Sequence, residues 1–143
     1  MSAADFLERA IEFLPVPDGP PYPEIRLHQA SIAFELATKA AILHGGGTHA
    51  DCLRARHDLV AGLDAARRYG FTATDAAEAT ARTLTPFYSS HRLDKLARDP
   101  GAADLERLYA VAVTQVAKVH AWIAASRCDV VACDAPKTHE NRR

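Results

Sequence analysis

The chain has 143 residues, a length that suits one domain with a substantial hydrophobic core. Its 17 basic residues are balanced by 18 acidic ones, and the resulting net charge of −1 excludes a protein that attracts nucleic acid over its whole surface. Any such binding must use a local basic patch. Hydrophobic residues make up 48% of the chain and charged residues 24%, which is typical of a globular rather than a disordered protein.

Apolar residues three and four positions apart, abundant Ala and short β-branched runs together predict helices and no sheet. The predicted helices cover residues 2–13, 24–44, 52–69, 74–85 and 100–127. Segment 87–98 is expected to be a loop with a helical turn, and segment 128–143 a flexible C-terminal tail. We therefore predict an all-α, up-and-down bundle of four to five helices, with residues 1–127 forming a single domain.

Several residues mark where these helices should begin and end. Ser2 with Asp5 three residues later predicts an acidic variant of the capping box. The other expected starts and stops are a Thr74 cap, an Asp99 cap before Pro100, a left-handed stop at Gly45, a terminator at Gly70, and a bend or end at Pro86.

The first 14 residues are amphipathic and acidic, without the basic start and the uninterrupted apolar stretch of a signal peptide. No segment reaches the roughly 18 uncharged apolar residues expected of a membrane span. The three cysteines are an odd number, which favours reduced thiols. We predict a cytoplasmic protein that does not enter a membrane.

The predicted second helix is apolar around most of its circumference, as expected of the most buried helix of a bundle. Leu36 is placed in its core face. Polar residues at spacings of three and four nevertheless form one stripe along it, consisting of His28, Ser31, Glu35, Thr38 and Lys39. A buried carboxylate and ammonium need partners, so either a neighbouring helix supplies them, or the stripe faces a site, or it faces a second subunit.

Three segments of the chain resemble, in the same order, the motifs of one known family. Residues 34–40, Phe-Glu-Leu-Ala-Thr-Lys-Ala, look like the Glu-Leu-Ala-x-Lys-Ala core of the HEPN (higher eukaryote and prokaryote nucleotide-binding) domain family. Gly45-Gly46 followed by residues 56–59, Arg-His-Asp-Leu, is similar to its glycine and His-x-Leu opening the third helix. Residues 84–94 resemble its leucine–aromatic–Tyr–x–x–x–Arg–Tyr–Pro segment, with Arg-Leu-Asp in place of Arg-Tyr-Pro. The resemblance covers residues 24–125.

This resemblance implies a helical bundle that is commonly a homodimer and that binds nucleotide or RNA or cleaves RNA. It also implies a toxin or defence component, with a nucleotidyltransferase or antitoxin as a partner. Active family members carry an Arg followed four to six residues later by a His. None of the 7 histidines here follows an Arg at that spacing, which argues against the usual ribonuclease activity.

If the protein is an enzyme, we expect a metal-independent endoribonuclease, with His91 or His28 moving the proton and Arg92 or Arg26 binding phosphate. Structural roles are the alternative. The loop around Arg92 can be solvated, with Arg92 capping a helix end. His57-Asp58 has the look of a helix-start cap. Glu35 and Lys39 are four apart and favour an intrahelical ion pair over a catalytic role.

For binding, we predict one anion-attracting cleft lined by Arg26, His28, Lys39, Arg92 and Lys95. The further candidate ligand-binding residues are Glu35, His57 and Tyr88. The cluster of His44, His49, Cys52 and His57 has loose spacing for zinc, so we expect no metal and no cofactor. The competing function is a non-catalytic protein-interaction module, such as a scaffold or an antitoxin-like partner.

Overall fold

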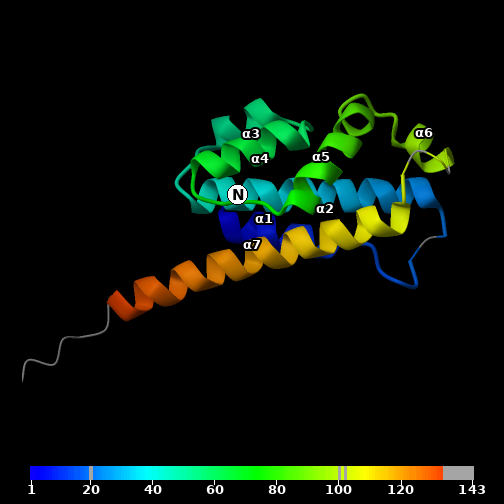
Figure 1. Cartoon of the computed structure of the whole chain (residues 1–143). Coiled ribbons are helices and arrows are strands. Elements are labelled where there is room, and N and C mark those ends of the chain that lie inside the picture. The colour runs from blue at the N-terminus through cyan, green and yellow to red at the C-terminus, as the bar shows by residue number, and fades with distance from the viewer. Residues whose placement is uncertain (20, 100, 102, 134–143) are drawn as a thin grey trace, which may run out of the picture.

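The computed structural model describes residues 1–19, 21–99, 101 and 103–133, with side chains to residue 126. Within these residues the chain is all-α, as predicted, and contains no strand. Figure 1 shows the arrangement of its helices. They are α1 (Ala3–Phe13), α2 (Pro23–His44), α3 (His49–Ala55), α4 (Leu59–Arg68), α5 (Asp75–Tyr88), α6 (Leu93–Arg98) and α7 (Leu105–Cys133).

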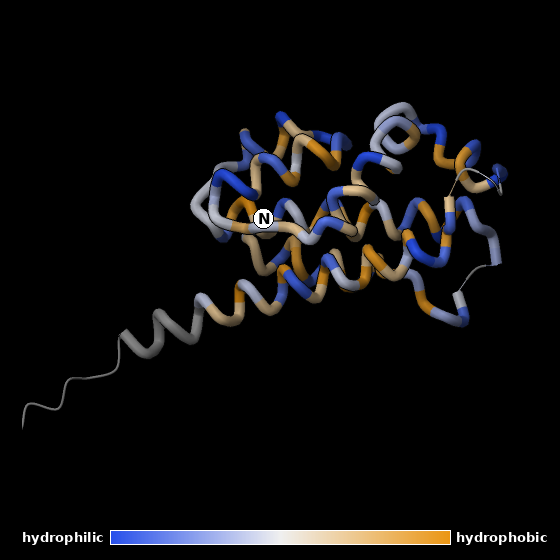
Figure 2. Tube along the Cα trace, in the orientation of Figure 1, coloured by the Kyte–Doolittle hydropathy of each residue, from blue (hydrophilic) through white to orange (hydrophobic). Residues whose placement is uncertain are grey.

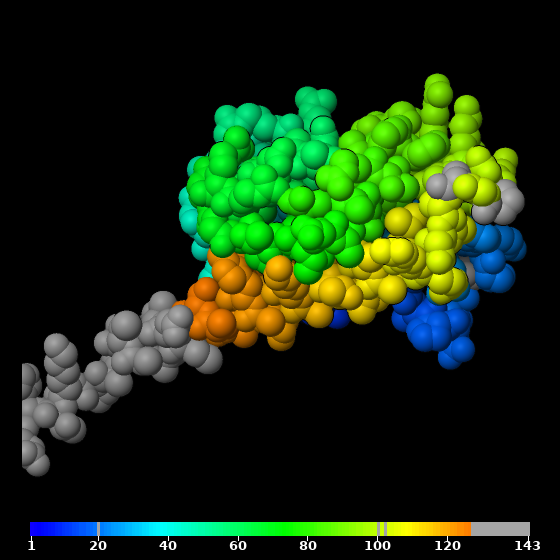
Figure 3. All heavy atoms as spheres, in the orientation of Figure 1, coloured from blue at the N-terminus to red at the C-terminus, as the bar shows by residue number. Residues whose placement is uncertain are grey.

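Helix α2 lies at the centre and contacts each of the other helices, with α1 and α7 on one side and α3 to α6 on the other (Figure 1). On the face drawn in Figure 3, α4, α5 and α7 cover α2 except near its two ends. Figure 2 shows apolar residues along the sides of the helices that face one another. The core has one half around Phe34 and another around Ile42, and both of these side chains are fully buried on α2.

Several predicted helix ends are confirmed. Ser2 and Asp5 form the capping box of α1, and the Thr74 hydroxyl accepts a hydrogen bond from the Ala77 amide at the start of α5. The left-handed residue after α2 was placed wrongly, because Gly45 has a φ of −74° and Gly46 has a φ of +103°. The stop lies one residue later, where the Gly47 amide closes the turn on the Ile42 carbonyl at 2.8 Å.

The predicted helix over 52–69 is wrong, because the chain breaks it into α3 and α4. Thr48 and Asp51 form a capping box that starts α3 three residues earlier than expected. The Asp58 carboxylate then accepts the Ala61 amide at 2.9 Å and starts α4. Side-chain caps satisfy amides that a continuous helix would pair with its own carbonyls, so they stabilise a new helix start at the break.

Two other predicted boundaries are wrong. Pro86 lies inside α5, which continues to Tyr88, so the proline does not end the helix where the sequence suggested. Residues 93–98 form α6, and α7 begins at Leu105 because the Asp104 carboxylate, rather than Asp99, accepts an amide of the first turn.

The apolar residues of helix α7 that lie three or four positions apart point inward, with Leu105 partly buried and Leu108, Ala112, Val116, Val119 and Ile123 buried. Its backbone is helical to Cys133, so the predicted tail does not begin at 128, and residues 134–143 lie outside the described residues. The stretch Leu105–Ser126 is long and apolar enough by length and composition to cross a membrane, although it contains Glu106, Arg107 and Lys118 and 44% of its 18-residue apolar window is buried in the fold. A core helix meets the same criterion, so this stretch is weak support for a membrane span.

The two neighbouring α2 residues Phe34 and Leu36 test the core. Phe34 is fully buried, whereas Leu36, expected in the core, is only partly buried. We expect Phe34→Ala to lower the free energy of unfolding by about 3–5 kcal/mol, because it opens a cavity in the core. Leu36→Ala should cost clearly less. Urea denaturation of both variants gives the comparison, and equal losses would contradict this placement of α2.

Candidate functional site

The carboxylate of Glu35 is the centre of the polar stripe on α2, and only 7% of this residue is exposed. Its Oε1 lies 2.8 Å from Nδ1 of His57 and 3.5 Å from Nζ of Lys39. The Tyr88 hydroxyl donates to Oε2 at 3.1 Å. One helix, the turn after α3 and the end of α5 therefore supply the partners that a buried carboxylate requires.

The remaining buried members of the stripe bond to their own helix. The Ser31 hydroxyl donates to the Leu27 carbonyl at 2.8 Å, and the Thr38 hydroxyl donates to the Phe34 carbonyl at 2.9 Å. Neighbouring elements of the same chain thus answer the stripe. The buried carboxylate of Glu35 therefore does not require a second subunit to supply its partners. A homodimer remains a prediction.

The contacts with Glu35 indicate which atoms of Tyr88 and His57 carry a proton. Burial, and then the nearby negative charge of Glu35 and its hydrogen bond, raise the pKa of Tyr88 well above its usual range, so its hydroxyl remains a donor. An ionised carboxylate only accepts hydrogen bonds, so Nδ1 of His57 carries the proton in this pair. Nε2 of His57 is then left to accept a proton or a hydrogen bond.

His91 is held at a backbone position that usually requires glycine. Its amide and the Arg92 amide bond to the Tyr88 and Phe87 carbonyls, the two bonds of a Schellman motif after α5. The same pair of bonds follows α2 and α4, where Gly46 and Gly70 occupy the left-handed position with φ of +103° and +98°. His91 occupies it with φ of +58°. A histidine therefore stands where glycine costs less.

Arg56 is strained in a similar way in the turn between α3 and α4. Its φ of 47° and ψ of −122° resemble the first central position of a type II′ turn, and the Asp58 amide closes that turn on the Ala55 carbonyl at 2.9 Å. Glycine is the usual residue there. The strained positions Arg56 and His91 flank the Glu35 network, and strain of this kind collects at functional sites.

A cavity of about 640 Å³ opens beside His57, and we call it the basic cavity. Its charged and imidazole side chains are those of Lys39, Arg54, Arg56, His57, Asp58 and His91. Three of these charges are engaged: Lys39 by Glu35, Arg54 by Asp51, and Asp58 by the start of α4. Arg56 forms no ion pair with another described residue, so its charge is available to an anionic ligand.

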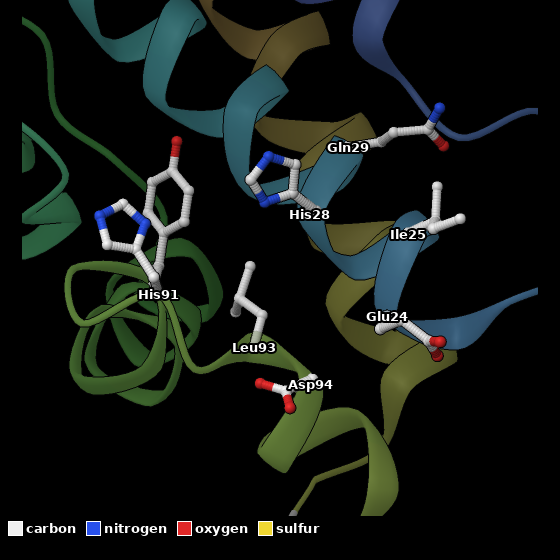
Figure 4. A pocket seen from close by; sticks show the side chains of 8 residues that line it. Glu24, Ile25, His28, Gln29, His91, Leu93 and Asp94 are labelled. Atoms are coloured by element: carbon white, nitrogen blue, oxygen red, sulfur yellow. The ribbon is translucent and has the colours of Figure 1, made fainter.

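A second cavity, of about 360 Å³, lies between α2, α5 and α6, and we call it the ring-lined cavity (Figure 4). Rings from three residues line it, Tyr88, His28 and His91. His91 also lines the basic cavity, so the two cavities adjoin at its side chain. The ring centroids of His57 and His91 are 6.0 Å apart, and those of His57 and Tyr88 are 5.0 Å apart.

The structure brings together only some of the residues predicted from the sequence. The two cavities are lined by His28, Lys39, His57, Tyr88 and His91, and Glu35 contacts three of these residues from the buried side of α2. The cleft of five residues is not formed, because the Arg26 guanidinium lies over the Tyr109 ring at 4.9 Å, and the exposed Arg92 and Lys95 line neither cavity.

The structure also bears on the helix cap, the ion pair and the metal cluster considered from the sequence. The helix-start cap is Asp58 alone, because the His57 imidazole bonds to Glu35 instead of to the backbone. The Glu35–Lys39 ion pair is present as expected. Among the residues that the structure describes, no three His, Cys, Asp or Glu side chains are grouped to hold a metal ion.

Sequence reasoning missed Arg54, Arg56 and Asp94 as cavity residues. Arg54 and Arg56 were assigned to the interior of one helix. The signal that could have revealed the break is the series Thr48, Asp51 and Asp58, since each is a residue type that favours helix starts.

Comparison with known proteins adds no relative. No family model matches the chain, and no curated protein and no solved structure matches it either. A functional argument therefore rests on the geometry of the two cavities and on the motifs from which the resemblance was drawn.

Glycine substitutions at the two strained positions test whether Arg56 and His91 lower the stability of the fold. We expect His91→Gly and Arg56→Gly each to raise the free energy of unfolding by about 0.5–1 kcal/mol, because glycine adopts a positive φ without steric cost. Gly46→Ala should lower it by about 1 kcal/mol, since nothing within 4 Å would meet the added Cβ and only the backbone strain changes.

Chemical denaturation of these variants and of a Ser90→Gly control measures the effect. Ser90 precedes the left-handed position, so glycine there should not stabilise the protein. A His91→Gly variant that is less stable than wild type would show that the imidazole stabilises the fold.

Proposed function

We propose that the chain is a HEPN-like helical protein that binds the phosphate groups of a nucleotide or RNA in the basic cavity. The observation that carries this proposal is the placement of Arg56, Lys39 and an oriented His57 around one opening. Guanidinium and ammonium groups are side-chain donors that proteins use for phosphate oxygens.

The local charge supports an anionic ligand although the chain as a whole is nearly neutral. Glu35 pairs with Lys39 and Asp51 pairs with Arg54, while the Asp58 carboxylate accepts an amide of α4, so Arg56 is the cation at the opening that has no ion pair with a described residue. The attraction is electrostatic and confined to this opening, and it should weaken as salt is added.

The resemblance gives separate support. Its three segments are far apart in the sequence, yet Glu35 and Lys39 from the first, His57 from the second and Tyr88 from the third meet at one carboxylate. A site shared by these motifs supports the family's nucleotide or RNA binding in this chain. A homodimer, a nucleotidyltransferase or antitoxin partner and a cytoplasmic role in defence belong to the same proposal.

Two exposed arginines distinguish the basic cavity from the cleft expected from the sequence. We expect Arg56→Gln to weaken binding of labelled RNA and of ATP about tenfold, because it removes the unpaired charge at the opening. Arg92→Gln should leave both affinities unchanged, since Arg92 lines neither cavity. Titrations at low and moderate salt, with helicity checked by circular dichroism, give the comparison.

The reverse result, with Arg92→Gln impaired and Arg56→Gln normal, would move the binding site to the predicted cleft. Absence of binding by wild type would favour the competing function, a protein-interaction module.

Cleavage of RNA is a second candidate function, and one observation favours it. The ring centroids of His57 and His91 are 6.0 Å apart at the basic cavity, and Glu35 orients the His57 imidazole. Two imidazoles near one phosphodiester can act as general base and general acid without a metal. The missing Arg-then-His spacing argues against it.

We expect little or no cleavage when the purified protein is incubated with unstructured RNA in EDTA, because the family's motif is absent. Cleavage that His57→Ala and His91→Ala each abolish, while Arg92→Gln retains it, would replace the binding proposal with an endoribonuclease.

A further inference from the structure

The ring-lined cavity differs in character from the basic cavity next to it. Apolar atoms dominate its wall, and neither Lys nor Arg lines it. Its charged residues are both acidic, Glu24 at the start of α2 and Asp94 at the start of α6. Figure 4 shows His91 and His28 on opposite sides of the opening, with Leu93 and Asp94 below them.

We propose that the ring-lined cavity binds a nucleobase that carries the 4-amino group of cytosine or the 6-amino group of adenine, with the attached phosphate in the basic cavity. This inference rests on the proposed function. It names the ligand class as a cytosine or adenine nucleotide in preference to a uracil or hypoxanthine one.

The size and the walls of the cavity fit a planar base. Its volume of about 360 Å³ lies at the lower end of the range of roughly 300–1,000 Å³ for small-molecule pockets. Aromatic and imidazole rings stack on bases irrespective of sequence, and His28 and His91 are both exposed here. Ring walls with little polar surface favour a base over a bare sugar or phosphate.

The carboxylates determine which base is preferred. The Asp94 carboxylate makes no hydrogen bond and no ion pair with another described residue, and the same holds for Glu24. Their places in the first turns of helices suit the helix dipole, but that role does not require them to line a cavity. An ionised carboxylate accepts from an amino group and repels a carbonyl oxygen, so it distinguishes the 4-amino group of cytosine from the 4-oxo group of uracil.

The two cavities also match the two ends of one nucleotide. His91 lines both cavities, so a ligand that passes its side chain would reach acidic acceptors on one side and Arg56 on the other. A cationic amine alone would not use Arg56, and inorganic phosphate alone would not use Asp94.

Isothermal titration calorimetry with matched nucleotides tests this assignment on the full chain. We expect CMP to bind about tenfold more tightly than UMP, and AMP about tenfold more tightly than IMP, as one charged hydrogen bond gained or lost would give. Ribose 5-phosphate should bind more weakly than CMP. The Asp94→Asn variant should level the CMP and UMP affinities, because an amide can donate to a carbonyl oxygen as well as accept.

Glu12→Gln is the matched control, since Glu12 is exposed on α1 and lines neither cavity. It removes one negative charge and should keep the preference for CMP. Equal affinities of wild type for CMP, UMP and ribose 5-phosphate, all weakened by Arg56→Gln, would overturn the base pocket and leave phosphate binding intact. No binding of any of these compounds would overturn the base pocket, and the absence of RNA binding as well would overturn the proposed function.

Discussion

The buried carboxylate of Glu35 is the constraint on which the site depends. It is placed on the most central helix, so its charge must be compensated by groups brought from elsewhere in the chain. His57 and Tyr88 do this from positions 22 and 53 residues away. Each of these contacts positions one segment against α2. The His57 contact holds the turn between α3 and α4 over α2, and the Tyr88 contact sets the distance between the end of α5 and α2. A polar group in the core thus specifies which surfaces surround the opening, beyond what apolar packing would specify.

This constraint gives a physical reason for the backbone around the site. His57 reaches Glu35 from the turn between α3 and α4, and that turn places Arg56 at a positive φ. His91 stands in the left-handed residue of a motif that the chain builds elsewhere with Gly46 and Gly70. Glycine occupies the positive-φ positions after α2 and α4. At the two strained positions the chain instead has Arg56 and His91, and both side chains line the basic cavity. Strain that recurs on both sides of one opening is better explained by what those side chains bind than by stability.

The sequence predicted the elements that local chemistry determines, and the failures have identifiable causes. The all-α class, the start of α1 at Ser2, the central position of α2 and the inward residues of α7 follow from caps and from apolar spacing. The break between α3 and α4 was missed because Arg56-His57-Asp58 interrupts an otherwise helical pattern by only three residues. The site was predicted in part. Glu35, Lys39, His57 and Tyr88 were candidates, but the expected cleft included Arg26, whose guanidinium packs on Tyr109. The spacing of residues along α2 predicts which face of the helix a residue occupies. It does not predict where the end of a long side chain lies, because that depends on its contacts with other helices.

The distribution of charge bears on which ligand the fold can hold. A protein that follows an RNA backbone needs basic groups along the whole path of the strand, and binding then falls steeply with salt because each neutralised phosphate releases a counterion. Here the net charge is −1, the cation at the basic cavity without an ion pair to a described residue is Arg56, and the adjoining cavity is acidic. Such an arrangement can neutralise about one or two phosphates, so the salt dependence of binding should be shallow. A steep dependence would require basic groups beyond these cavities. Under the proposed function, this distribution of charge suits a single nucleotide unit, or the end of a strand, better than a long stretch of RNA lying across the bundle.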